Sequence, residues 1–237
     1  MADRTPAADF SSRLARFQDL FAARVVIFDF DGVLVDSERF HYMAYNAVFR
    51  KYGHEIDETE YYKFWTSLGL GPRGEIERHG LALDPVRIRE EKRPIFSGLC
   101  RDGTIRFYPE ARELVDRLWR AEKLLAIASG STGADIAAIL ANEGLEDRFA
   151  AIVGSDVVPA LKPAPDIFLH ALAALGAAPA HALVVEDAEK GVHAAIAARI
   201  PVVVVRTRET RTIDFAAADL VLESHAELIE MTRRVFA

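Results

Sequence analysis

Val25-Val26-Ile27-Phe28-Asp29-Phe30-Asp31-Gly32 is an apolar run that ends in two acids and a turn-forming glycine. A β-branched run without polar alternation is typical of a strand that is buried on both faces of a parallel sheet. Asp29 and Asp31 lie two positions apart at its C-terminal end, so both side chains project to one side while Phe30 turns away. Ligands of open α/β sheets bind beyond this end of the strands, and we therefore expect a site there.

Short apolar runs recur along the chain and alternate with helical patterns. This alternation predicts an α/β fold, a doubly wound, Rossmann-like parallel sheet. The further strands are expected at Leu124 to Ala128, Ala151 to Gly154, Ala182 to Glu186 and Val202 to Val205, with helices at about Ser131 to Glu143, Pro165 to Leu175 and Glu189 to Ala198.

The stretch 37–108 breaks this rhythm, because it carries helical periodicities and no convincing strand. It predicts an all-helical cap that is inserted after the first core strand. The core would then consist of 1–36 and 109–237, and the two connections between core and cap could act as a hinge.

Composition and charge limit the class of protein. The 237 residues are 51% hydrophobic and 27% charged, as in globular proteins, and 29 Lys and Arg against 36 Asp and Glu give a net charge of -7. An acidic chain has no broad basic face, so we expect no nucleic-acid partner. Cys100 is the only cysteine, and neither a signal peptide nor a long apolar span is evident. We expect a cytoplasmic protein without membrane contact, either a monomer or a homodimer.

A second acidic pair, Glu186-Asp187, closes another apolar run. If its strand lies near the first, up to four carboxylates share one small volume, and such crowding requires protonation or a cation. Hard oxygen ligands favour Mg²⁺. The alternative is that strand-ending acids only cap turns or helices. The occurrence of two such pairs favours the metal site.

Asp29-Phe30-Asp31-Gly32-Val33-Leu34-Val35-Asp36-Ser37-Glu38 resembles the first motif of the haloacid dehalogenase superfamily. Ser129 is similar to the second motif, Lys162 in Lys162-Pro163-Ala164-Pro165-Asp166 to the third, and Glu186-Asp187 to the fourth. The four occur in the family's order between Arg24 and Val205. The pattern is similar to phosphoglycolate phosphatase-like and β-phosphoglucomutase-like members with a helical cap.

This resemblance implies a role for each motif residue. Asp29 would be the nucleophile that forms an aspartyl-phosphate, and Asp31 the general acid and base. Asp29, Asp187, Glu186 and the backbone carbonyl of Asp31 would hold Mg²⁺. The phosphoryl oxygens would be bound by Ser129, the amide of Gly130 and Lys162. Taken alone, a serine is often only an N-cap and a lysine only a solvated side chain.

The cap is expected to determine the specificity for the substrate, a small phosphorylated metabolite. His41 and Lys92 occupy positions similar to a histidine and a lysine of the mutase-like members, and Arg73 lies in a segment similar to their substrate loop. These cations could bind a second anionic group. The alternatives are a solvated helical face for Arg73 and Lys92, and packing at the hinge for His41.

The resemblance implies a Mg²⁺-dependent phosphatase that acts on a sugar phosphate or phosphoglycolate type of ester. A β-phosphoglucomutase-like phosphomutase is the alternative, although Ser131-Thr132-Gly133 replaces the Ser-Lys-Asn with which mutases hold the distal phosphate. A non-catalytic binding domain is the second alternative, and the four intact motifs argue against it. The acid Asp31 argues against dehalogenase and phosphonate-cleaving activities.

Overall fold

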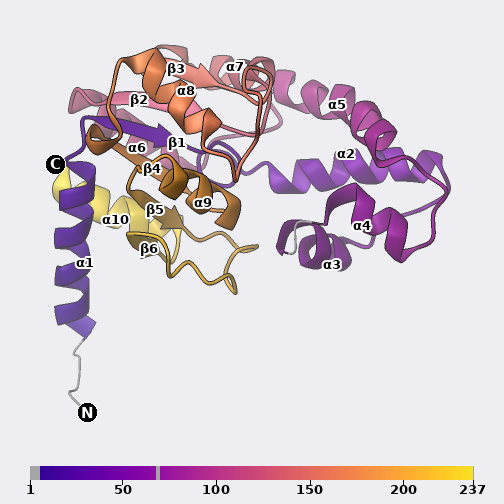
Figure 1. Cartoon of the computed structure of the whole chain (residues 1–237), viewed down its shortest axis with the longest axis horizontal. Coiled ribbons are helices and arrows are strands. Elements are labelled where there is room, and N and C mark those ends of the chain that lie inside the picture. The colour runs from indigo at the N-terminus through magenta and orange to yellow at the C-terminus, as the bar shows by residue number, and fades with distance from the viewer. Residues whose placement is uncertain (1–5, 68–69, 237) are drawn as a thin grey trace.

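The fold is a six-stranded, all-parallel sheet covered by helices on both faces, as a computed structural model describes it for residues 6–67 and 70–236 (Figure 1). The strands lie in the order β3-β2-β1-β4-β5-β6. This topology confirms the predicted doubly wound α/β class. The strands are β1 (Val25–Phe28), β2 (Leu124–Ala128), β3 (Ala151–Val153), β4 (Ala182–Glu186), β5 (Val202–Val205) and β6 (Leu220–Leu222).

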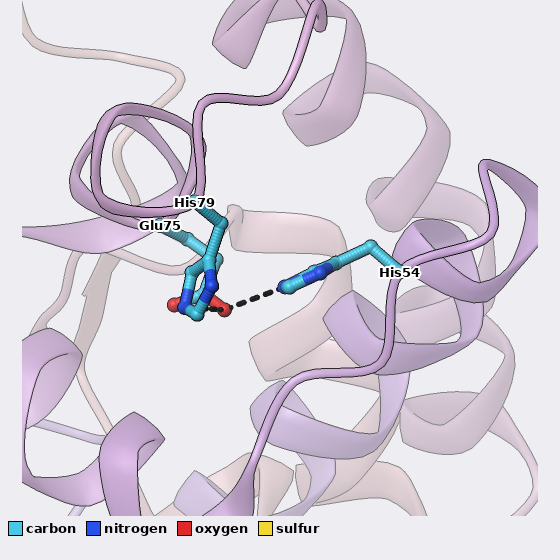
Figure 2. A group of neighbouring side chains, drawn as sticks. All are labelled: His54, Glu75 and His79. Carbon is cyan, nitrogen blue, oxygen red and sulfur yellow. Dashed lines mark hydrogen bonds and ion pairs between the residues drawn. The ribbon is translucent and has the colours of Figure 1, made fainter.

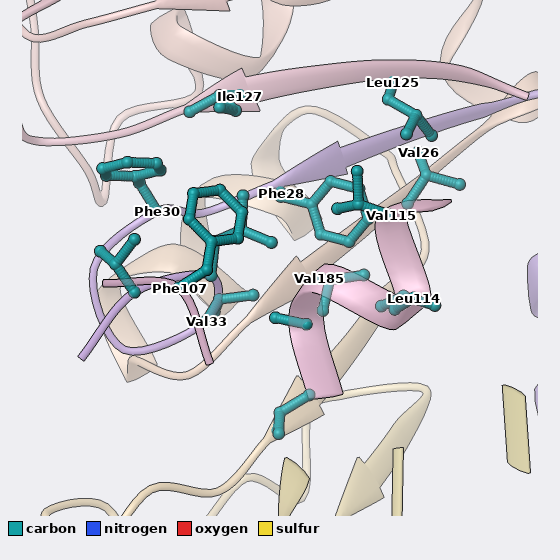
Figure 3. Close-up of a cluster of buried hydrophobic side chains, with 14 of the residues drawn as sticks. Val26, Phe28, Phe30, Val33, Phe107, Leu114, Val115, Leu125, Ile127 and Val185 are labelled. Atoms are coloured by element: carbon teal, nitrogen blue, oxygen red, sulfur yellow. The ribbon is translucent and has the colours of Figure 1, made fainter. Parts of the chain in front are cut away.

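Alternate residues of each strand enter different hydrophobic clusters, because side chains of a strand point to opposite faces. Val26 and Phe28 pack in one cluster (Figure 3), whereas Val25 and Ile27 pack in the other. The first cluster also receives residues of α1 (Pro6–Phe21), α6 (Pro109–Arg120), α7 (Gly133–Glu143) and α10 (His225–Val235). The second receives residues of α8 (Asp166–Leu175) and α9 (Glu189–Ala197).

Helices also form the cap, which extends from one side of the sheet (Figure 1). They are α2 (Glu38–Lys51), the short α3 (Glu58–Glu60), a π-helix (Tyr61–Ser67), α4 (Gly71–Arg78) and α5 (Pro85–Arg101). They enclose a third apolar cluster that includes Phe49 and Trp65. Within 37–67 and 70–108, no residue belongs to a strand of the sheet, so the structure agrees with an all-helical segment. The predicted limits at 37 and 108 stay a prediction.

Four elements of the core were not predicted: α1, α6, β6 and α10. Two short 3₁₀ helices, Glu146–Arg148 and Pro179–His181, precede β3 and β4. In the described part of the chain, every helix is too short or too polar to cross a membrane.

Candidate active site

Neighbouring strands bring the predicted acids together. β1 pairs with β2 on one side and with β4 on the other, with Phe28 level with Ile127 and Val185. The residues that follow these strands therefore meet at one edge of the sheet. The amide of Asp29 donates to the carbonyl of Val185 at 2.9 Å, which continues the β1–β4 ladder as far as the first acid.

Lys162 joins two of these carboxylates. Its Nζ donates to Asp29 Oδ1 and to Glu186 Oε1, both at 2.6 Å, and to the carbonyl of Ala128 at 2.9 Å. Burial alone would lower the pKa of Lys162, but the charges of Asp29 and Glu186 raise it above its ordinary value. The lysine is therefore a fixed cation beside Asp29.

The acids outnumber the cation. Carboxylate oxygens of Asp29, Glu186 and Asp187 lie within 4.8 Å of one another. Burial raises the pKa of Asp29 despite the opposing charge of Lys162, and burial followed by the charges of Glu186 and Asp29 raises the pKa of Asp187. Three clustered acids against one lysine leave negative charge that a bound cation would offset. An all-oxygen donor set of this kind fits a hard divalent cation such as Mg²⁺.

Two glycines leave room for these acids. A Cβ on Gly32, which has a φ of +83°, would lie 2.2 Å from Asp187 Oδ2. A Cβ on Gly191 would lie 1.9 Å from Glu186 Cδ. Real Cβ atoms do not approach other atoms so closely, so larger residues at either position would displace a carboxylate.

Hydroxyl groups surround Asp31. Ser37 Oγ donates to Asp31 Oδ1 at 2.5 Å, Ser131 Oγ to Oδ2 at 2.6 Å and Ser129 Oγ to Oδ2 at 3.2 Å. His41 Nε2 lies 3.6 Å from Oδ1. Burial would raise the pKa of Asp31, but the hydrogen bond and charge of His41, together with Ser131 and Ser37, hold it below its ordinary range. Asp31 is thus held as a carboxylate.

A cavity of about 600 Å³ opens over this edge of the sheet. The core side contributes Asp29, Asp31, Gly130, Lys162, Glu186 and Asp187, and the cap side contributes His41, Tyr45, Trp65, Gly71, Pro72 and Arg89. Its volume is that of a small-metabolite site. Acids, a lysine and a glycine loop therefore face a space that the cap covers.

The three cap residues predicted to bind substrate lie in different places. His41 lines the cavity, and Lys92 lies behind it, with Nζ 2.6 Å from His41 Nδ1. Arg73 is exposed on α4 and is not among the described residues that line the cavity. Arg89 lines it instead. Arg89 precedes Lys92 by one helical turn, and this spacing could have pointed to it.

The sequence interpretation also missed Ser37 and Ser131 as partners of Asp31. Ser37 belongs to the first motif itself, and Ser131 follows β2 by three residues. Their hydroxyl groups could be recognised only once the loops were placed. Ser129 is fully buried, and its Oγ accepts from the amide of Ser131 at 3.0 Å, which fixes the loop toward Asp31.

Fold and site together define a protein of the α/β class whose acids lie at the switch point of a doubly wound parallel sheet, under a helical cap. The chain belongs to the haloacid dehalogenase-like hydrolase family, whose model matches residues 23–199. Relatives that are named phosphatases support its assignment as a phosphoric monoester hydrolase.

Two relatives illustrate the similarity. Protein CbbY of Rhodobacter capsulatus is 32% identical over 206 residues, which cover 83% of this chain and 91% of that protein. Fructose-1-phosphate phosphatase YqaB of Escherichia coli is 34% identical over 188 residues, which cover 76% and 95%.

Solved structures extend this similarity. CbbY from Rhodobacter sphaeroides in complex with phosphate is 30% identical with a TM-score of 0.74, and the match covers 87% of this chain and 96% of that one. A mutant of the same protein in complex with xylulose-(1,5)bisphosphate is 30% identical with a TM-score of 0.75, at the same coverage.

Proposed function

We propose that this chain is a Mg²⁺-dependent phosphatase that hydrolyses a small phosphorylated sugar through an aspartyl-phosphate on Asp29. The observation that carries the proposal is the contact of Asp29 with Lys162 beside Glu186 and Asp187, where the cavity opens. A carboxylate held by a cation and facing a metabolite-sized space suits attack on a phosphoryl group.

The first half of the reaction transfers the phosphoryl group to the enzyme. A carboxylate oxygen of Asp29 forms a bond to phosphorus while the bond from phosphorus to the sugar oxygen breaks. The leaving oxygen takes its proton from Asp31. Because Asp31 is held as a carboxylate, it must first take up that proton from solvent, and His41 Nε2, 3.6 Å from Oδ1, helps to orient the carboxylate.

The second half releases phosphate. Asp31, again a carboxylate, removes a proton from water, whose oxygen attacks phosphorus and frees the carboxylate of Asp29. The hydroxyl groups of Ser131 and Ser37 donate to Asp31 and stabilise this base form. Asp29, Glu186 and Asp187, with the backbone carbonyl of Asp31, would hold Mg²⁺, which when bound offsets negative charge on the transferring group.

Sugar phosphates are the proposed substrates because of the cavity and the relatives. Arg89 and Lys190 also line the cavity and offer positive charge to a second anionic group. One relative is named for fructose 1-phosphate, and one solved neighbour was crystallised with a sugar bisphosphate. We include a sugar with a second phosphate in the proposed substrate class.

The loop after β2 favours hydrolysis over the mutase reaction, in which the phosphoryl group is transferred back to a sugar hydroxyl. Ser131 donates to Asp31, and the amide of Gly133 donates to Asp156 Oδ1 at 2.8 Å. Neither group is directed to a distal phosphate, and the segment Ser131-Thr132-Gly133 carries no cation.

Phosphate release from a panel of esters tests the proposal. Fructose 1-phosphate, xylulose 1,5-bisphosphate and phosphoglycolate would be assayed with Mg²⁺ and in excess chelator, and β-glucose 1-phosphate with a bisphosphate activator. We expect Mg²⁺-dependent phosphate release, greatest with a sugar ester. Undiminished activity in chelator, or isomerised hexose phosphate without free phosphate, would contradict the proposal.

A further inference from the structure

A second group of metal-ligating side chains lies in the cap, outside the cavity lining. His54, Glu75 and His79 each offer a ligand atom, and these atoms lie within 4.8 Å of one another (Figure 2). Glu75 and His79 are four residues apart at the end of α4, so they share one face of the helix. His54 comes from the connection between α2 and α3 and projects toward them.

The two oxygens of Glu75 have different neighbours. Oε1 lies 2.8 Å from His54 Nε2 and 3.5 Å from His79 Nε2. Oε2 accepts from Trp65 Nε1 at 3.1 Å and from Arg78 Nη1 at 3.3 Å. One oxygen thus faces both imidazoles while the other is fixed by donors, as in metal sites whose ligands are oriented by an outer layer of hydrogen bonds.

The distances suit a tetrahedral ion. Ligands at about 2.0–2.1 Å from zinc are about 3.4 Å apart in a tetrahedral site. The 3.5 Å between Glu75 Oε1 and His79 Nε2 agrees with this value. The 2.8 Å hydrogen bond to His54 would have to lengthen by about 0.6 Å as the ion replaces its proton.

The side chains of the cluster differ in their exposure to solvent, and this difference suits a bound ion. The side chain of Glu75 is fully buried, whereas that of His79 is 35% exposed. A buried carboxylate supplies charge in a poorly solvated place, and the exposed histidine leaves an entry path and a coordination position for water. Glu60 Oε2 lies 3.4 Å from His79 Nε2 and is ion-paired with Arg78.

We propose that His54, Glu75 and His79 form a Zn²⁺ site in the cap, distinct from the acidic site at the sheet. Two imidazoles and one carboxylate are ligands of zinc rather than of magnesium, whereas the cluster of Asp29 has oxygen ligands only. Arg78 pairs with the far oxygen of Glu75 and with Glu60, which leaves Glu75 Oε1 to the two imidazoles.

The ion would connect the cap's structure to the cavity. It would tie the connection before α3 to the end of α4, whose first residues Gly71 and Pro72 line the cavity. Trp65 lines the cavity as well, and its indole holds Glu75. Occupancy of the site therefore fixes two parts of the cavity wall.

Equilibrium dialysis against Zn²⁺ in excess Mg²⁺, with metal analysis of the protein, tests the site. The variants are His54→Gln and His79→Gln, because a glutamine amide retains a donor near Nε2 but is a poor zinc ligand. His193→Gln is the matched control. His193 also follows a glutamate, Glu189, by four residues, and its Nε2 lies 3.6 Å from Glu189 Oε1. Among the described residues, this pair belongs to neither cluster of potential metal ligands. Circular dichroism and a thermal unfolding transition confirm that each variant is folded.

We expect the wild-type protein and His193→Gln to take up one more Zn²⁺ than either cap variant, and each cap variant to bind it at least about tenfold more weakly. In the unmodified protein, two-bond ¹H–¹⁵N spectra should show the Nε2 resonances of His54 and His79 moving on Zn²⁺ addition. Equal uptake by all four proteins, or unmoved resonances of these two histidines, would overturn the proposal and leave the cluster as a hydrogen-bond network around Glu75.

Discussion

Replacement of Lys92 by methionine should make the protein more stable at neutral pH. Lys92 is only 8% exposed, and its Nζ lies 3.8 Å from the centre of the Phe96 ring. Burial lowers the pKa of Lys92 from 10.5 to about 8, although the charges of Asp31 and Glu38 oppose the shift. Methionine is similar in length and carries no charge to bury.

The difference between these pKa values sets the magnitude. A change from 10.5 to about 8 corresponds to a cost of about 3 kcal/mol for keeping Lys92 charged in the folded protein. The variant also loses the interaction of the ammonium with the Phe96 ring, worth about 1–2 kcal/mol, and the 2.6 Å contact of Nζ with His41 Nδ1, worth about 1 kcal/mol. We therefore expect a net gain of about 1 kcal/mol in the free energy of unfolding at pH 7.

The pH dependence gives the sharper test. The folded pKa lies below the unfolded value, so between pH 8 and 10.5 the unfolded chain binds more protons, and wild-type stability rises with pH in that window. The methionine variant lacks this rise. Its advantage should be largest at pH 7 and shrink as the pH approaches 10.

Urea unfolding of both proteins at several pH values measures this difference. Lys51→Met is the control, because the side chain of Lys51 is 55% exposed and its loss should add no such pH dependence. A stability difference between Lys92→Met and wild type that stays constant from pH 7 to pH 10 would refute the reasoning.

Three further variants test the site. Asp31→Asn should lower kcat by about 10²–10⁴-fold, because an amide cannot transfer the proton; an unimpaired rate in steady-state assays would show that the acid lies elsewhere. Gly191→Ala favours the helix by about 1 kcal/mol, yet its Cβ would lie 1.9 Å from Glu186 Cδ, and we expect about a hundredfold loss of turnover in a folded protein. Wild-type turnover would show that Glu186 can move without consequence. Arg89→Ala should raise KM for substrates with a second phosphate more than Arg73→Ala does; the reverse order in a comparison of a mono- and a bisphosphate would return that role to Arg73.

Much of the core could be predicted from the sequence because local patterns determine it. Unbroken apolar runs identified five strands, and the acids that follow β1 and β4 met as expected because those strands are neighbours. β6 escaped prediction because it follows β5 without an intervening helix, outside the strand–helix alternation that identified the other strands. The amphipathic pattern of α1 could be seen in the sequence, but the sequence did not show that its apolar side packs on the first core cluster.

The cap was harder to predict because its contacts depend on tertiary structure. Helical periodicity predicted helices there, yet it could not show that Arg89 faces the cavity while Lys92 lies behind His41. The proposed zinc ligands in the cap were equally hard to predict. The spacing of Glu75 and His79 can be read from the sequence, but His54 joins them only through the fold.

The central claim is that Asp29 accepts the phosphoryl group, and identification of the phosphorylated residue tests it most directly. The enzyme would be mixed with a ³²P-labelled sugar phosphate and Mg²⁺, quenched in acid within the first turnover, and its peptides analysed by mass spectrometry. We predict label on Asp29 and neither label nor turnover in Asp29→Asn. Label on another residue, or full turnover by Asp29→Asn, would contradict the claim.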